Sequence, residues 1–130
     1  MKQSKLEEAE VLSRRALEGR ERVLGVDHPS TLRAVNNLGL LLQKQGKLEE
    51  AEVQSRRVLE GLERVLGIDH PNTLHAVNNL GGLLYKQGKL EESVSLLRRA
   101  LEGFERVLGP EHPNTQNAAG WLEGVTSKLK

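Results

Sequence analysis

The segment Lys47–Gly88, KLEEAEVQSRRVLEGLERVLGIDHPNTLHAVNNLGGLLYKQG, repeats almost unchanged the segment before it, Lys5–Gly46. The two segments differ at eight of 42 aligned positions, and a third, more divergent copy occupies residues 89–130. A fixed period of this length is the sequence signature of a repeat protein, in which each repeat packs on its neighbours. The repeat therefore determines the fold class before any single motif is considered.

The composition restricts the class of function. Charged residues are 28% of the 130 residues and nearly balanced, with a net charge of +1. This balance argues against a nucleic-acid surface, which needs a clustered basic excess. No apolar run approaches the roughly 20 residues of a membrane span, and the start, MKQSKLEE, has no apolar signal-peptide core. The sequence has no cysteine, and we expect a cytoplasmic protein that needs no cofactor and binds neither nucleic acid nor membrane.

Each repeat predicts two helices separated by a turn. Apolar residues recur at the 3–4 spacing of one helix face in each half of the repeat. In the first copy Gly25 supplies the left-handed residue that ends a helix, and Pro29 forces His28 out of the helical region. Asp27 or His28 can then cap the next helix. The predicted helices are residues 5–24, 29–45, 48–66, 71–87, 90–108 and 114–129.

The phase of the repeat determines the order of the helices. We call the first helix of each hairpin A and the second B, so the chain reads B, A-B, A-B, A. The prediction is a single all-α domain over residues 1–130, with a half repeat at 5–25, full repeats at 28–66 and 70–108, and a half repeat at 112–130. Each end therefore presents a helix face that has no partner helix in the sequence.

The pattern LG-x-DHP-x-TL-xx-VNNLG-x-LL-xx-QGKLEEAE, read from Leu24 to Glu52 and again from Leu66 to Val94, resembles the tetratricopeptide repeat. The resemblance is to its 42-residue form, typical of kinesin light chains. It implies a right-handed α-solenoid of antiparallel helix pairs, whose concave groove is lined by A helices and binds peptides. It also implies small residues where A and B helices cross, as at Gly39 and Gly81.

Three further glycines, Gly19, Gly61 and Gly103, lie inside predicted B helices. Glycine there costs about 1 kcal/mol relative to alanine. We expect close helix packing to be the compensation for this cost.

The resemblance also implies which residues line the groove. Carried over residue by residue, they are Arg33, Asn36, Leu40, Gln43 and Lys44 in the first A helix, His75, Asn78, Gly82, Tyr85 and Lys86 in the second, and Asn117, Gly120, Gly124, Ser127 and Lys128 in the third. In the family, the asparagine that matches Asn36 and Asn78 often bonds the backbone of the ligand. Gly120 replaces this asparagine in the third helix, and Gly82, beside Gly81, is expected to deepen the groove.

Three of the eight differences between the two similar copies fall in helix A beyond its first turn, and all three are groove positions. They are Arg33/His75, Leu40/Gly82 and Gln43/Tyr85. A duplicated scaffold with altered recognition would show this pattern. Free drift at exposed positions is the alternative explanation.

No constellation of residues predicts catalysis or a metal site. His28, His70 and His112 each follow an acid and precede a proline, and they lie one period apart. They therefore belong to separate turns, where capping explains them better than a shared metal. The Glu-Glu pairs at the starts of B helices suit the helix dipole. No nucleophile, base and orienting group converge, so we do not expect an enzyme.

The groove favours an acidic ligand. Its charged positions are all basic: Arg33, Lys44, His75, Lys86 and Lys128. This predicts an acidic peptide, extended or in a short helix, bound weakly and with salt dependence. Asn36 and Asn78 would hold its backbone, while Leu40 and Tyr85 would receive an apolar side chain.

A self-assembling repeat module is the alternative function. The last A helix and the first B helix would together make one whole repeat, so that chains stack head-to-tail or exchange ends in a closed dimer. Trp121 is the candidate for self-association, because tryptophan is enriched at interface hot spots. The plainer interpretation is that Trp121 covers the core near the terminus.

Overall fold

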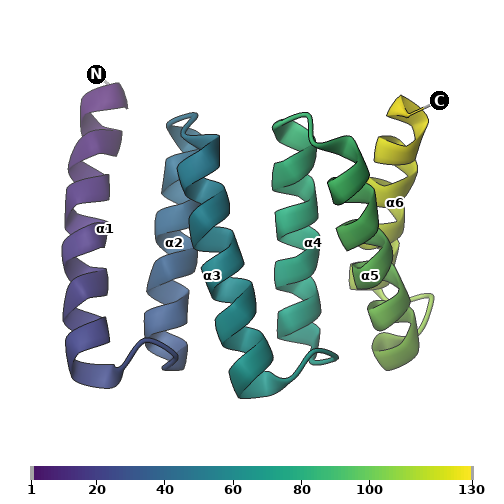
Figure 1. Cartoon of the computed structure of the whole chain (residues 1–130), viewed down its shortest axis with the longest axis horizontal. Helices are drawn as coiled ribbons and strands as arrows, with labels where there is room; N and C mark the ends of the chain where they lie inside the picture. Colours follow the sequence, from purple (N-terminus) through teal and green to yellow (C-terminus); the bar gives the residue numbers. More distant parts are fainter. Residues whose placement is uncertain (1, 130) are drawn as a thin grey trace. The chain divides into compact units, whose positions relative to one another are not determined.

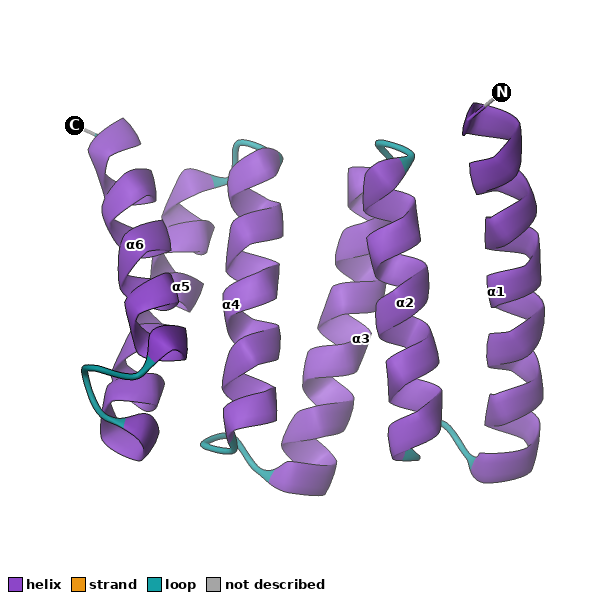
Figure 2. Cartoon of the chain, turned by 180° about the vertical axis from the view of Figure 1, so that it is seen from behind, coloured by secondary structure: helices purple, strands orange, loops and turns teal. Residues whose placement is uncertain are grey.

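The computed structural model describes the backbone of residues 2–129 and the side chains of residues 5–129. This part of the chain forms six helices and no strand (Figure 1 and Figure 2). The helices are α1 (Lys2–Leu24), α2 (Pro29–Lys44), α3 (Leu48–Leu66), α4 (Pro71–Lys86), α5 (Leu90–Leu108) and α6 (Pro113–Lys128). The all-α prediction is confirmed, and each helix begins and ends within three residues of its predicted bounds.

A histidine caps the start of each A helix. The Nδ1 atom of His28 accepts a hydrogen bond of 3.0 Å from the backbone N–H of Ser30. His70 and His112 cap α4 and α6 in the same way. Each cap satisfies one of the backbone donors that a helix leaves open at its N-terminus. The predicted capping role of these histidines is therefore confirmed.

The chain divides into two compact units, Met1–Val65 and Leu66–Lys130. We call them unit 1 and unit 2 and describe each by itself. Unit 1 contains α1, α2 and nearly all of α3, and unit 2 contains α4, α5 and α6. The single domain expected over residues 1–130 stays a prediction.

Helix α2 carries much of the core of unit 1. Its residues Leu32, Val35, Leu38 and Leu42 are buried. Leu32 fits into a notch on α3 at Gly61, where a Cβ atom would lie only 2.6 Å from the Cδ2 atom of Leu32. Such a distance is too short for real atoms, so the leucine and the glycine are matched in shape.

The same fit recurs in unit 2. A Cβ atom at Gly103 of α5 would lie 2.5 Å from the Cδ2 atom of Leu74 of α4. At a second crossing of these helices, a Cβ atom at Gly81 would lie 2.7 Å from Leu97. The hydroxyl of Ser93 donates to the carbonyl oxygen of Gly81 at 2.7 Å. Small residues therefore allow the backbones to approach closely, as the sequence predicts.

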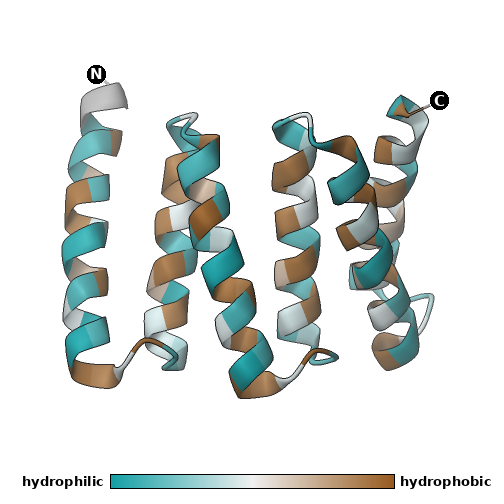
Figure 3. Ribbon diagram, viewed as in Figure 1, coloured by the Kyte–Doolittle hydropathy of each residue, from teal (hydrophilic) through white to brown (hydrophobic). Residues whose placement is uncertain are grey.

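Polar and apolar residues alternate in short bands along the helices (Figure 3). This is the pattern of amphipathic helices, each with one face in the core. The largest fully buried side chains belong mostly to α2, α4 and α5. Neighbouring helices of each unit therefore bury apolar faces against one another and leave polar faces exposed.

Ion pairs link successive B helices and the turns that follow them. Acidic residues of one repeat pair with basic residues of the next: Glu10–Lys47, Glu21–Arg57 and Asp27–Arg64 in unit 1, and Asp69–Arg106 in unit 2. We call this set the ion-pair ladder. Arg64 donates to both carboxylate oxygens of Asp27, at 2.9 and 2.8 Å, and holds the pKa of Asp27 below its usual value. Surface pairs are individually weak, and these recur at related positions of successive repeats.

Glu10 of α1 is the most strongly perturbed of these acids. Its carboxylate accepts hydrogen bonds from Gln45 at 2.8 Å, Arg14 at 2.8 Å and Lys47 at 3.0 Å. These bonds, with that from Gln45 the strongest influence, lower the pKa of Glu10 from 4.5 to about 2. Because the folded pKa is below the unfolded one, Glu10 stabilises the fold above pH 4.5, and this contribution is lost as the pH falls towards 2.

We predict that Glu10→Gln lowers the free energy of unfolding by about 1 kcal/mol at pH 7, after allowance for solvent screening. The difference from the wild type should shrink steadily as the pH falls from 5 towards 2. Urea unfolding followed by circular dichroism at several pH values measures it. Glu8→Gln, an exposed change on the same helix, is the control. A difference that is independent of pH, or matched by the control, would contradict this role of Glu10.

The three repeat-related glycines give a second prediction. Apart from its chain neighbours and the backbone of its own helix, nothing lies within 4 Å of a Cβ placed at Gly19, whereas Leu32 and Leu74 block the equivalent space at Gly61 and Gly103. Gly19→Ala should therefore stabilise the chain by up to about 1 kcal/mol through helix propensity. Gly61→Ala and Gly103→Ala should each destabilise it by about 1–2 kcal/mol through overpacking. Equal effects of the three substitutions in urea unfolding would show that the notches do not control the packing.

Candidate functional site

In unit 1 the predicted groove residues form one row along α2. Arg33, Leu40 and Lys44 are exposed, while Asn36 and Gln43 are half-buried. Their spacing of three or four residues places them on one face of the helix. Leu40 is 47% exposed, a large apolar side chain between the cations Arg33 and Lys44. The row therefore offers a short apolar surface flanked by positive charge.

In unit 2 the predicted residues of α4 differ sharply in exposure. His75 and Lys86 are exposed and Tyr85 is half-buried, but only 5% of Asn78 is exposed. The Nδ2 of Asn78 donates to the Oδ1 of Asn117 at 2.9 Å, which joins α4 to α6. The Oδ1 of Asn78 is buried and has no hydrogen-bond partner in the described part of the chain. A buried acceptor without a partner is energetically costly. The Oδ1 of Asn78 can therefore still accept a hydrogen bond.

Trp121 of α6 packs over Gly82 of α4. A Cβ atom at Gly82 would lie 3.5 Å from the indole ring, which is a normal van der Waals distance. The rings of Trp121 and Tyr85 meet edge to face, with centroids 6.0 Å apart and an angle of 71°, a favourable aromatic geometry. The expectation that Gly82 deepens the groove is therefore wrong, because Trp121 occupies the space. The prediction that Trp121 takes part in self-association stays a prediction.

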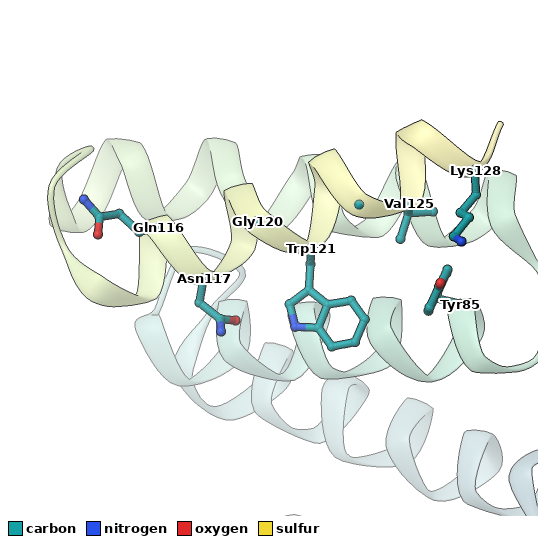
Figure 4. A pocket seen from close by; sticks show the side chains of 8 residues that line it. Tyr85, Gln116, Asn117, Gly120, Trp121, Val125 and Lys128 are labelled. Atoms are coloured by element: carbon teal, nitrogen blue, oxygen red, sulfur yellow. The ribbon is translucent and has the colours of Figure 1, made fainter. Parts of the chain in front are cut away.

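A pocket of about 480 Å³ opens beside this aromatic pair. Its lining residues are Tyr85, Gln116, Asn117, Gly120, Trp121, Gly124, Val125 and Lys128. Trp121 projects from α6 at the middle of the pocket, and Lys128 extends towards Tyr85 at one end (Figure 4). Lys128 is the only cation among the lining residues, which include no acid. The pocket thus combines an aromatic wall with one positive charge.

A second pocket of about 440 Å³ lies next to the first, since both include Asn117 and Trp121 in their linings. The other residues that line it are His75, Asn78, Asn79, Phe104, Pro113 and Asn114. This pocket is rich in side-chain amides and contains the buried Asn78. The two pockets together form a continuous strip along α4 and α6, which we call the unit 2 strip.

The strip brings together some of the predicted residues and leaves others out. Tyr85, Lys128, His75 and Asn78 line it, together with Asn117, Gly120 and Gly124. Lys86 is not among its lining residues. The assignment of these residues to ligand binding stays a prediction.

The sequence interpretation did not place Trp121 in the strip. The 42-residue register aligns Trp121 with Asn79, which also lines the strip but was not among the predicted groove residues. One signal was present in the sequence: Gly82 lacks the side chain that Leu40 has in the first copy, and a large ring appears at Trp121 in the next A helix. Paired changes of volume of this kind indicate residues that pack together.

The described residues show no other type of site. No group of three or more His, Cys, Asp or Glu side chains among them is arranged to hold a metal ion. Within the same residues, no helix has the length and apolar character needed to cross a membrane.

Comparison with known proteins places the chain in a family. The family model described as tetratricopeptide repeat matches residues 1–64, 34–99 and 75–123, which together span most of the chain. No curated protein sequence matches the chain.

Solved structures show the same fold. The chain is similar to BtubC (BKLC) from P. vanneervenii, with a TM-score of 0.87 and 21% sequence identity, over 97% of this chain and 50% of that one. It is also similar to a candidate kinesin light chain from Podosopora anserina with nearly identical TPR-like repeats, with a TM-score of 0.76, 23% identity and coverage of 97% and 68%. The chain therefore spans half the length of BtubC. From the family match and this fold we conclude that the chain belongs to the tetratricopeptide repeat family, whose repeats generally serve as protein-interaction scaffolds.

Proposed function

We propose that the chain is a scaffold that binds an acidic peptide on the exposed faces of its A helices. The observation that carries this proposal is the pocket of the unit 2 strip, where Tyr85 and Trp121 form an aromatic wall next to Lys128. Aromatic side chains with a nearby cation provide both apolar contact area and charge complementarity. Tetratricopeptide repeat proteins are typically scaffolds rather than enzymes, and this proposal requires no catalytic group.

The shape of α6 supports close approach of a ligand. Gly120 and Gly124 both line the pocket, and nothing lies within 4 Å of a Cβ placed at either position. The surface of α6 is therefore bare backbone beside Trp121. A peptide that lies there brings an apolar side chain against the indole and a carboxylate towards Lys128.

The free acceptor of Asn78 supports recognition of the peptide backbone. Its Oδ1 is buried in the strip, next to the pocket that Asn114 and Asn117 also line. On binding, the amide of Asn78 would have to turn this oxygen towards the pocket, where a backbone N–H of the ligand would satisfy it and release that cost. In unit 1, Arg33, Leu40 and Lys44 supply the same two elements, an apolar contact and positive charge.

The single tryptophan of the sequence makes the proposal testable. The probe is a peptide rich in glutamate that contains one leucine and no tryptophan, titrated while the fluorescence of Trp121 is recorded. We expect saturable binding that weakens as salt is added. Lys128→Glu should weaken it about fivefold, the equivalent of about 1 kcal/mol for one reversed rim charge.

Arg98→Glu is the matched control, because it makes the same change of net charge at an exposed position of α5. It should leave the affinity nearly unchanged. A peptide with lysine in place of glutamate should not bind. If Lys128→Glu has no effect, or if Arg98→Glu weakens binding equally, then the strip is not the acidic-peptide site.

A further inference from the structure

The two units show how a B helix receives the A helix of its own hairpin. Leu32 of α2 fills the notch at Gly61 of α3, and Leu74 of α4 fills the notch at Gly103 of α5. Both leucines are the fourth residue of their helix, and both are nearly fully buried. This leucine-in-glycine contact is therefore the regular connection between A and B helices in this chain.

Helix α1 is also a B helix, and its notch is empty. Gly19 stands one period before Gly61, and no other atom lies within 4 Å of a Cβ placed there. Small residues surround it at the same spacing as in α3: Ala9, Ser13 and Ala16 on α1 correspond to Ala51, Ser55 and Val58. Ala16 and its neighbour Leu12 are exposed, and 61% of Leu12 is accessible. The face of α1 that would receive an A helix is thus intact and uncovered in unit 1.

The ion-pair ladder provides a second, independent observation on α1. Arg57 and Arg64 of α3 pair with acids of the preceding repeat, Glu21 and Asp27. Their counterparts on α1, one period earlier, are Arg15 and Arg22. Both are exposed, and neither has a hydrogen bond or ion pair within the described part of the chain. The ladder therefore begins on α1 with two cations that lack their acids.

The chain's own C-terminal helix pair matches these cations but not the notch. Glu105 and Glu111 stand at the ladder positions that Glu21 and Asp27 occupy two periods earlier, and both are exposed. Helix α6, however, carries Gln116 where α2 and α4 carry the inserted leucine.

Two further positions of α6 have changed in the same direction. Glu123 stands where Gly39 and Gly81 lie at the helix crossings, and Thr126 stands where Leu42 and Leu84 are fully buried. The face of α6 that would pack on a B helix is therefore polar. Burying a carboxylate there without a partner is strongly unfavourable.

We propose that the outer face of α1 is a docking surface for a B–A helix pair of another tetratricopeptide repeat chain of the 42-residue type. The A helix of that partner carries leucine at its fourth position, which enters the notch at Gly19. The preceding B helix and turn of the partner supply acids to Arg15 and Arg22. The α5–α6 pair of a second copy of this chain has the acids but is excluded by Gln116, Glu123 and Thr126. This proposal is independent of the peptide site on the A helices.

The test builds a fitting helix pair into the same chain. The variant Gln116→Leu/Glu123→Gly/Thr126→Leu restores on α6 the residues of α4, so that α6 of one copy fits α1 of the next. Light scattering after size exclusion should show a constant monomer mass for the wild type at all concentrations. The triple variant should form head-to-tail assemblies whose mass rises with concentration.

Blocking the notch provides the control for non-specific association. Gly19→Leu, added to the triple variant, fills the notch and should return the mass to that of the monomer. Circular dichroism of each variant checks that it is folded. If the triple variant fails to fold, the double variant Gln116→Leu/Glu123→Gly, which changes two exposed positions and removes the carboxylate, should give the same association in weaker form.

A charge swap tests the ladder separately. Arg15→Glu with Arg22→Glu should weaken the association of the triple variant about tenfold, and Glu105→Arg with Glu111→Arg in the same chain should restore it. A wild type that assembles, a folded triple variant that stays monomeric, or assemblies that survive Gly19→Leu would each overturn the proposal.

Discussion

The insertion of a leucine into a notch above a glycine is the contact on which the rest of the structure depends. Leu32 against Gly61 and Leu74 against Gly103 bring the backbones of A and B helices closer than any other residue at those positions would allow. The glycine weakens its own helix, and the buried leucine compensates through packing. Because α2 and α4 use this face for their partner B helices, the faces that carry the predicted groove residues are left out of this contact.

The strip on unit 2 follows from this division of faces. Helices α4 and α6 are both A helices, and their free faces carry Tyr85, Trp121 and Lys128. The loss of a side chain at Gly82 made room for Trp121, so the groove there is an aromatic pocket instead of a deeper channel. The exposed face of α4 thus differs from that of α2, while the leucine and glycine that hold α4 to α5 are the same as those between α2 and α3.

The sequence was sufficient for the helices and their caps, because these depend on local chemistry that recurs every 42 residues. The glycine, histidine and proline of each turn determine where helices end and begin, and Gly25 adopts the left-handed conformation with a φ of 93°. The role of Trp121 was not predictable from the repeat, since its register aligns that residue with Asn79, an exposed asparagine that lines the strip but was not among the predicted groove residues. The ion-pair ladder was also missed, because Arg57 and Arg64 meet acids 36 and 37 residues away and a helix-face argument considers only near neighbours. The burial of Asn78 depends on contacts with α6 that the second copy alone does not reveal.

A double-mutant cycle between Leu74 and Gly103 tests the central claim most directly. The free energy of unfolding would be measured for the wild type, Gly103→Ala, Leu74→Ala and the double variant. The account predicts that Gly103→Ala destabilises the chain when Leu74 is present and is neutral or stabilising when residue 74 is alanine, with a coupling energy of about 1 kcal/mol or more. Strictly additive effects would contradict the account, because they would mean that the leucine does not occupy the space above the glycine.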